Sequence, residues 1–155
     1  MIRRACEKDI PRLIELLAQV LEIHAKIRPD IFISGTTKYT VEELSCMLTD
    51  EKKPIYVAAD ENDRVLGYAF CELKENPFTT NMVQFKSMYI DDLCVDEAAR
   101  GMKLGKQLFE KVKEEAKKLG CYEITLAVCE GNDSARAFYD KIGMKTKESI
   151  MEFVL

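Results

Sequence analysis

The pattern of hydrophobic and polar residues near the start of the chain predicts two elements. The short stretch Ile2–Ala5 is predicted as a strand. From about Lys8 to Lys26, apolar residues recur every three or four positions, as one face of an amphipathic helix requires. Pro11 suits the first turn of such a helix, because its missing N–H is not needed there. The chain is therefore predicted to begin with a strand followed by a long helix.

A second, shorter helix is predicted over Val41–Asp50. Thr40 precedes it and is the residue type expected at an N-cap. Between the two helices, Pro29 and Gly35 interrupt any regular pattern and indicate a loop. A substrate-facing loop and a plain connector fit this stretch equally well.

The remaining pattern predicts strands that alternate with helices. Pro54–Asp60 and Arg64–Leu73 are rich in β-branched and aromatic residues around a short polar turn, which is typical of a hairpin. The later predicted elements are a strand at Gln84–Val95, a helix ended by Gly120, a strand at Tyr122–Val128, a helix at Asn132–Ile142 ended by Gly143, and a last strand at Glu148–Leu155.

Composition fits one soluble domain. The 155 residues are 47% hydrophobic and 32% charged, which suits a single α/β domain over residues 1–155 with one core. No stretch reaches the length of a membrane span and no leader pattern precedes the first helix, so a cytoplasmic protein without a membrane partner is expected. The net charge of −4 disfavours nucleic-acid binding and is compatible with a cationic substrate.

The cysteine pattern favours buried thiols over a metal site or disulfides. None of the six cysteines forms a C-x-x-C pair, and several lie in or beside predicted strands. The single histidine, His24, gives little support to a zinc site or a Cys–His nucleophile. No metal is expected.

The stretch "ARGMKLGKQLF", Ala99–Phe109, places glycines where a loop enters a helix. Such a junction can hold an anion, because the first N–H groups of a helix have no partner within it. The spacing differs from a Walker A loop, which needs four residues between its glycines and Ser or Thr after the lysine. Here three residues separate Gly101 from Gly105, and Gln107 follows Lys106. A nucleotide P-loop is therefore not expected.

Two segments together resemble the GNAT superfamily of acetyl-CoA-dependent N-acetyltransferases. "LCVDEAARGMKLGKQLF" is similar to the family's strand and R-G-x-G-x-G turn, and "NDSARAFYDKIGM" to its Asn…Ala…Tyr…Gly segment. The order of predicted elements agrees over essentially the whole chain. The resemblance implies a mixed, mostly antiparallel central sheet, flanked by helices and with splayed central strands.

The resemblance also implies acetyl-CoA as cosubstrate and a set of residues that hold it. The turn would cradle the pyrophosphate, and the strand before it would pair with the pantetheine arm through its main chain. A backbone N–H of that strand could also polarise the thioester carbonyl. The implied coenzyme-binding residues are Leu93, Cys94, Val95, Arg100, Gly101, Met102, Lys103, Leu104, Gly105, Lys106 and Asn132.

Three of these residues have other interpretations. Lys103 replaces the middle glycine of the motif. The helix is expected to begin near Lys103, where a residue needs no positive φ. The Lys103 side chain could either crowd the phosphates or contribute positive charge to them. Cys94 could carry an acyl group but is more simply a core residue. Asn132 could also serve as a helix cap.

Tyr139 and the pair Asp91 and Asp92 are the candidate catalytic residues. By resemblance, Tyr139 donates a proton to the departing thiolate; the alternative is a place in an apolar stripe of its helix. An amine must lose a proton before it attacks, and a carboxylate is the expected base. Neighbouring strand residues face opposite sides, so only one aspartate is expected to face the site, and similarity to polyamine-type members favours Asp91.

The predicted function is acetyl transfer to a primary amine of a small molecule or peptide by direct attack in a ternary complex. An acetyl-CoA-binding sensor or interaction module without turnover is the alternative, and Lys103 is the feature that favours it. Ala127 stands where relatives that acetylate ribosomal-protein N-termini carry glutamate, which disfavours that substrate. The loops His24–Tyr39 and Lys74–Met82 are expected to line the acceptor side. Homodimers are usual among similar proteins, although the sequence itself shows none.

Overall fold

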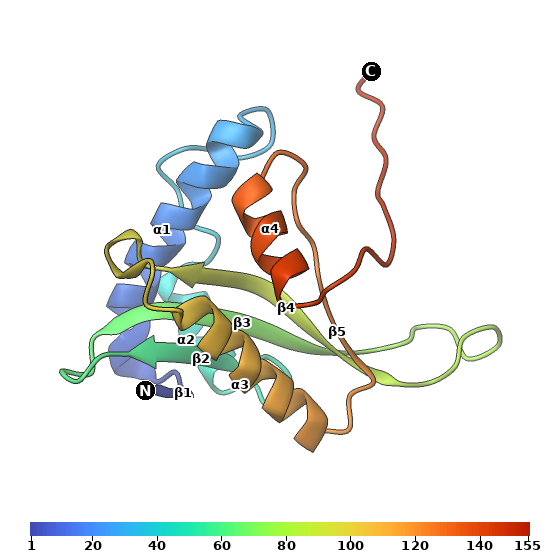
Figure 1. Cartoon of the computed structure of the whole chain (residues 1–155), viewed down its shortest axis with the longest axis horizontal. Helices are drawn as coiled ribbons and strands as arrows, with labels where there is room; N and C mark the ends of the chain where they lie inside the picture. The colour runs from blue at the N-terminus through green and yellow to red at the C-terminus, as the bar shows by residue number, and fades with distance from the viewer.

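A five-stranded sheet with helices on both faces forms the centre of the protein (Figure 1). The computed structural model describes all residues, 1–155. Its elements are β1 (Ile2–Arg4), α1 (Ile10–Ile27), α2 (Val41–Leu48), β2 (Ile55–Ala59), β3 (Val65–Glu75), β4 (Lys86–Val95), α3 (Leu104–Lys118), β5 (Glu123–Leu126) and α4 (Asp133–Lys141), with short 3-10 turns at Glu7–Asp9 and Glu97–Ala99.

The strands lie in the order β1–β2–β3–β4–β5. Neighbours are antiparallel except for β4 and β5, which are parallel. The mixed, mostly antiparallel sheet predicted above is therefore confirmed. No helix of the structure combines the length and the apolar character that crossing a bilayer would need.

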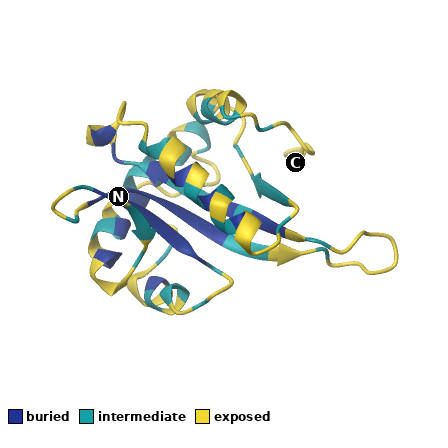
Figure 2. Cartoon of the chain, turned by 60° about the horizontal axis from the view of Figure 1, so that its bottom comes forward, coloured by how far each residue is buried: buried dark blue, intermediate teal, exposed yellow.

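The core consists of two layers, one on each face of the sheet. On one face, α1 and α2 cover β2 and β3, and Leu13, Leu16 and Leu17 are completely buried. On the other face, Leu108 and Val112 of α3 pack against the central strands. Figure 2 shows the buried residues concentrated in the middle strands and in the sides of the helices that face them.

The predicted helix ends agree with the local chemistry. Thr40 caps α2, since its hydroxyl accepts the Glu43 N–H at 3.1 Å. Gly120 and Gly143 follow α3 and α4 with φ of 73° and 98°, a backbone conformation that favours glycine. These three predictions are confirmed.

The last predicted strand is wrong. Residues 145–155 contain no regular element, and the predicted strand Tyr122–Val128 is shortened to Glu123–Leu126. Strand-type residues become a strand only when a neighbour supplies hydrogen bonds. No such neighbour lies beside Glu148–Leu155 in this chain, and β5 stays at the edge of the sheet.

Candidate active site

A gap between β4 and β5 lies at the centre of the candidate site. The two strands pair only from Ser87 with Glu123 to Ile90 with Leu126. Beyond Ile90, β4 continues to Val95 with β3 as its only neighbour. The strands therefore splay, as the resemblance implies, and one edge of the second half of β4 is left without a strand partner.

Main-chain groups of β4 point into this gap at alternate residues. The Asp96 N–H donates to the Leu66 carbonyl across the β3 side at 2.7 Å. Because main-chain groups alternate in direction along an antiparallel strand, those of Cys94 also point toward β3. Those of Leu93 and Val95 point into the gap and can pair with an extended ligand.

The Cys94 side chain belongs to the core. It is 8% exposed, and its thiol lies 3.8 Å from the Leu16 carbonyl of α1. Burial raises the pKa of the Cys94 thiol to about 12, so the nucleophilic thiolate is scarce at neutral pH. The packing supports the core interpretation over an acyl-cysteine.

A β-bulge occurs at the two aspartates. Phe70 pairs with Asp92, but the next residue, Cys71, pairs with Ile90, so Asp91 is an extra residue in β4. An extra residue shifts the alternation of side chains by one position. The prediction that Asp91 and Asp92 face opposite sides is wrong, because it assumed a regular strand.

Both carboxylates lie on the face that α1 and α2 cover. The Asp91 carboxylate accepts hydrogen bonds from the Lys38 ammonium at 2.9 Å and from the Tyr39 hydroxyl. The Asp92 carboxylate accepts from the Tyr68 hydroxyl at 2.9 Å. Tyr68 is part of the core under α1 and α2, and Tyr39 packs against that core.

The two aspartates differ in their electrostatic surroundings. Asp91 has a direct cationic partner in Lys38. Asp92 forms no ion pair, and its burial raises the pKa of its carboxyl, although the Tyr68 hydrogen bond and the charges of Lys38 and His24 oppose that effect. A raised pKa brings a carboxylate closer to the range in which it acts as a general base.

Tyr139 lies on α4, near enough to Asp92 for the charge of that carboxyl to act on its hydroxyl. It is half-buried, and its ring packs against that of Phe138 with centroids 5.1 Å apart. Burial, and secondarily the charge of Asp92, raise the pKa of the Tyr139 hydroxyl well above its ordinary range. The hydroxyl is therefore protonated at neutral pH and can donate a proton or a hydrogen bond.

The loop before α3 has an unusual backbone. Gly101 and Lys103 have φ of 88° and 60°, and α3 begins only at Leu104. The expectation that Lys103 needs no positive φ is wrong: Lys103 is the N-cap, in the left-handed region that disfavours side chains. The glycine of the family motif would fit this position without strain.

The geometry around the loop fits a phosphate group. The first N–H groups of α3 lack helical acceptors, and Lys106 is exposed in that first turn. At Gly105, a Cβ atom would lie 3.3 Å from the Phe138 ring, so the missing side chain lets α3 approach α4 closely. These donors and this charge suit the coenzyme pyrophosphate.

Other predicted coenzyme residues have structural roles as well. Arg100, just before Gly101, is exposed and forms an ion pair with Glu97 at 3.7 Å. Asn132 is the N-cap of α4, and its side-chain oxygen accepts the Ala135 N–H at 3.4 Å. The cap interpretation of Asn132 is therefore confirmed, while its contact with coenzyme stays a prediction.

Only one of the two predicted acceptor loops lies near the aspartates. Lys38 and Tyr39 hold Asp91, and the Tyr39 ring stacks on Phe70 with centroids 5.6 Å apart. Lys74–Met82 leads into the β3–β4 connection, which projects from the opposite end of β4 (Figure 1). Its expected place at the acceptor side stays a prediction. Tyr68, Lys38 and Tyr39 carried no motif, because their roles depend on contacts between distant segments.

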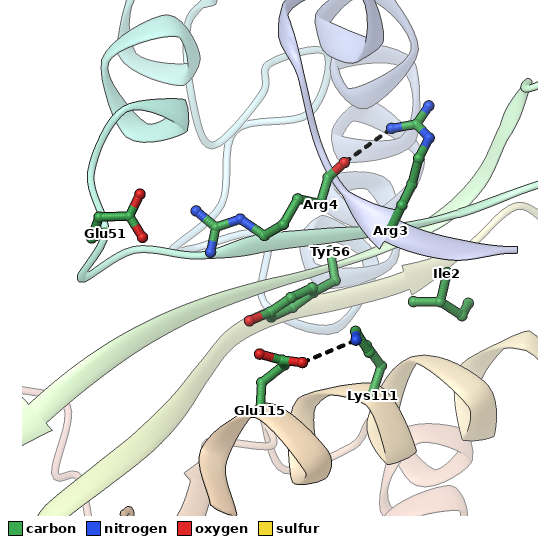
Figure 3. A pocket seen from close by; sticks show the side chains of 7 residues that line it. All are labelled: Ile2, Arg3, Arg4, Glu51, Tyr56, Lys111 and Glu115. Carbon is green, nitrogen blue, oxygen red and sulfur yellow. Dashed lines mark hydrogen bonds and ion pairs between the residues drawn. The ribbon is translucent and has the colours of Figure 1, made fainter. Parts of the chain in front are cut away.

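A second hollow lies between β1, β2 and α3, away from the gap (Figure 3). Two of its cations are already engaged: Lys111 pairs with Glu115 at 2.9 Å, and Arg3 donates to the Arg4 carbonyl at 3.0 Å.

Solved structures share the fold of this chain. A mutant form of a Bacillus halodurans protein is 35% identical, with a TM-score of 0.95 over 100% of this chain and 99% of that one. Glucosamine-6-phosphate N-acetyltransferase from Arabidopsis thaliana is 25% identical, with a TM-score of 0.72 over 99% of this chain and 97% of the enzyme.

Sequence relatives agree with the structural ones. Thialysine N-epsilon-acetyltransferase of Bos taurus is 25% identical over 92% of this chain and 82% of its own length. The Arabidopsis glucosamine 6-phosphate N-acetyltransferase sequence is 37% identical over a shorter stretch, 40% of each chain. The model of the Acetyltransferase (GNAT) family matches residues 17–144. Because this match includes β4, β5, the loop before α3 and α4, the chain belongs to the GNAT family of N-acetyltransferases.

Proposed function

We propose that the protein transfers the acetyl group of acetyl-CoA, the donor that GNAT enzymes use, to a primary amine of a small molecule. The observation that supports the proposal is that Asp92 lies on β4 just beyond the last residue paired with β5, and that its charge acts on the hydroxyl of Tyr139 from α4. A base and a proton donor at one opening are what a direct transfer from thioester to amine needs. Residues 1–155 would act as one catalytic domain.

Asp92 is the better-placed base. An amine with a pKa near 10 is mostly protonated at neutral pH and must give up a proton before its nitrogen attacks the thioester carbon. Asp92 has no direct cationic partner, and its raised pKa favours proton acceptance. Asp91, paired with Lys38 and Tyr39, would instead attract and orient the substrate ammonium.

Tyr139 would act on the leaving group. When the carbon–sulfur bond breaks, negative charge develops on the coenzyme sulfur, and a phenol hydroxyl can stabilise it by donating its hydrogen. Leu93 and Val95 would hold the extended arm through their main chains, in the manner of an added strand. Because nitrogen attacks carbon directly, no acyl group passes through Cys94.

The substrate class follows from the charges at the acceptor side. Two carboxylates on one face favour a cationic amine over a neutral or acidic group. The names of the relatives refer to thialysine and glucosamine 6-phosphate, both small molecules with a primary amine. A small aliphatic amine or diamine is therefore the first class to test.

Two measurements, made one after the other, test the proposal. Acetyl-CoA at 100 times its Kd should stabilise the fold by about 2.7 kcal/mol, visible as a rise in Tm. A screen of diamines, amino acids, amino sugars and peptides should then release free coenzyme thiol with at least one amine. An unchanged melt at millimolar acetyl-CoA would overturn the coenzyme site. Binding without turnover for every amine would favour the sensor alternative.

A further inference from the structure

Lys38 carries a primary amine of the chain itself to the acceptor side of the candidate site. Its ammonium donates one hydrogen bond to the Asp91 carboxylate at 2.9 Å and another to the Asp91 carbonyl at 3.3 Å. It also lies 5.6 Å from the centroid of the Tyr39 ring. A carboxylate, a carbonyl and an aromatic face are groups that recognise an ammonium. Lys38 therefore occupies the position that Asp91 is proposed to offer to a substrate amine.

The loop around Lys38 is held against the body of the protein. Next to Lys38, the Tyr39 ring stacks on Phe70 of the core with centroids 5.6 Å apart. Earlier in the same loop, the Gly35 N–H donates to the Glu22 carboxylate of α1 at 2.6 Å. The Lys38 side chain is nevertheless 42% exposed. The loop thus fixes the amine at Asp91, and a second molecule can still approach it from solvent.

The proposed base and proton donor lie close to this amine. Asp91 follows Ile90, the last residue of β4 that pairs with β5, so the amine is bound where the two strands separate. The charge of Lys38 acts on the Asp92 carboxyl, and the charge of Asp92 acts on the Tyr139 hydroxyl. An amine, a carboxylate base and a phenol donor therefore lie within electrostatic range of one another, as acetyl transfer requires.

We propose, resting on the acetyl transfer proposed above, that the protein acetylates its own Lys38. The Lys38 ammonium loses one proton to Asp92, and its nitrogen then attacks the thioester carbon of acetyl-CoA. The carbon–nitrogen bond forms, the carbon–sulfur bond breaks, and Tyr139 protonates the leaving thiolate. The second proton of the attacking nitrogen restores the Tyr139 hydroxyl, and the proton on Asp92 passes to solvent. The products are an acetylated lysine, the free coenzyme thiol and one proton.

The reaction would take place once in each chain. The acetylated nitrogen is an amide without charge, so it can neither attack a second thioester nor form an ion pair with Asp91. Because donor site and acceptor belong to one chain, the rate for each molecule should not depend on protein concentration. A rate that rises with protein concentration would mean that one copy modifies another, and would overturn the transfer within one chain.

Peptide mass spectrometry after incubation with isotope-labelled acetyl-CoA tests the modification. Lys8 is the matched control, because its ammonium also pairs with a carboxylate, that of Asp63, but at the turn between β2 and β3. The Lys8 side chain is 63% exposed, more than that of Lys38, so chemical acetylation without catalysis would not favour Lys38. Lys38 should gain the label about 10²-fold faster than Lys8. Equal rates at the two lysines would overturn the proposal.

Two substitutions connect the label to the candidate site. Tyr139→Phe should slow the acetylation of Lys38 about 10²-fold and leave the slow chemical acetylation of Lys8 unchanged. Lys38→Arg keeps a positive charge beside Asp91, and it should reduce the label on the whole chain to the chemical background. Circular dichroism checks that both variants are folded. Labelling of Lys38 at the parent rate in folded Tyr139→Phe would contradict catalysis by this site.

A parallel assay with small amines separates self-acetylation from the proposed function. Turnover of a small amine by a protein whose Lys38 stays unmodified would overturn self-acetylation and leave the proposed function intact. Catalysed labelling of Lys38 without turnover of any small amine would support self-acetylation and contradict the small-molecule acceptor. If the protein binds acetyl-CoA but neither reaction occurs, both proposals fail.

Discussion

The two halves of the sheet differ in how much they are buried. All five residues of β2 are buried, and most of β3 is buried as well, between α1 and α2 on one side and α3 on the other. In β5 no residue is buried, and α4 has none either. The proposed chemistry lies on the loosely covered half, where β4 and β5 separate and main-chain groups of β4 stay available. Packing around β2 and β3 is therefore expected to supply more of the stability than packing around β5 and α4.

The largest expected effect is on the stability of the packed half. Leu17→Ala removes a completely buried side chain of α1 and should lower the free energy of unfolding by about 2–5 kcal/mol. Leu126→Ala in β5 should cost about 1 kcal/mol or less, because its side chain is only half-buried. Urea unfolding measures both. Equal losses would remove the contrast between the two halves.

On the open half, Tyr139→Phe should separate activity from stability. The ring and its packing against Phe138 remain, so the fold and the affinity for acetyl-CoA should be retained. Turnover should fall about 10²-fold, the usual scale for loss of an acid–base group. Steady-state thiol release with a saturating amine is the measurement. A rate equal to that of the parent, with chemistry limiting, would make Tyr139 a packing residue only.

Asp92→Asn should have opposite effects on activity and stability. The pKa of the Asp92 carboxyl is higher in the folded protein than in the unfolded one. As the pH rises from the unfolded to the folded pKa, ionisation of this carboxyl therefore lowers the free energy of unfolding. At neutral pH the asparagine variant should therefore be at least as stable as the parent, and this advantage should vanish near pH 4. Its turnover should fall by about 10- to 10²-fold. Urea titrations at several pH values and thiol-release rates measure the two effects.

Asp91→Asn is the matched comparison for Asp92. Loss of its ion pair with Lys38 should raise the KM for the amine more than it lowers kcat. A larger fall in kcat, with a displaced pH profile, for Asp91→Asn than for Asp92→Asn would exchange the two roles.

The smallest effect is expected at the cradle. Lys103→Gly removes a side chain from a left-handed backbone position and so relieves strain of about 1–2 kcal/mol. The greater flexibility of glycine in the unfolded chain offsets part of this gain. A net gain of up to about 1 kcal/mol should appear in urea unfolding. The Kd for acetyl-CoA, measured by calorimetry, should change less than about tenfold, or 1.4 kcal/mol. A loss of stability would show that the Lys103 side chain makes a favourable contact that outweighs the strain.

Local patterns predicted the helices and their ends well. The helical period of α1, the Thr40 cap and the glycines after α3 and α4 all act within a few residues, so sequence spacing reveals them. The motif glycines also correctly placed a turn before α3, whereas its role as a coenzyme cradle stays a prediction. Elements whose formation depends on a distant partner were predicted less well: the expected last strand lacks a neighbour within the chain.

The residues of the candidate site stay predictions, whereas part of its geometry could be checked. Tyr139 and the cradle were named from the family resemblance and the two aspartates from their place on the strand. The alternation rule misplaced the aspartates, because the bulge depends on the pairing of β3 with β4. The contacts of Lys38 and Tyr39 with Asp91 join segments more than fifty residues apart. Such contacts leave no periodic signal in the sequence.

The extra residue at Asp91 also limits how β4 can change in evolution or in design. Ile90 and Leu93 both contribute to the core on the α3 side although they are an odd number of positions apart. Deleting one residue here would restore the regular alternation of side chains along β4. Either the aspartates or the apolar residues on one side of them would then turn to the opposite face of the sheet. Single-residue insertions and deletions in β4 should therefore be tolerated far less than substitutions. The length of this strand is as much a part of the site as its side chains.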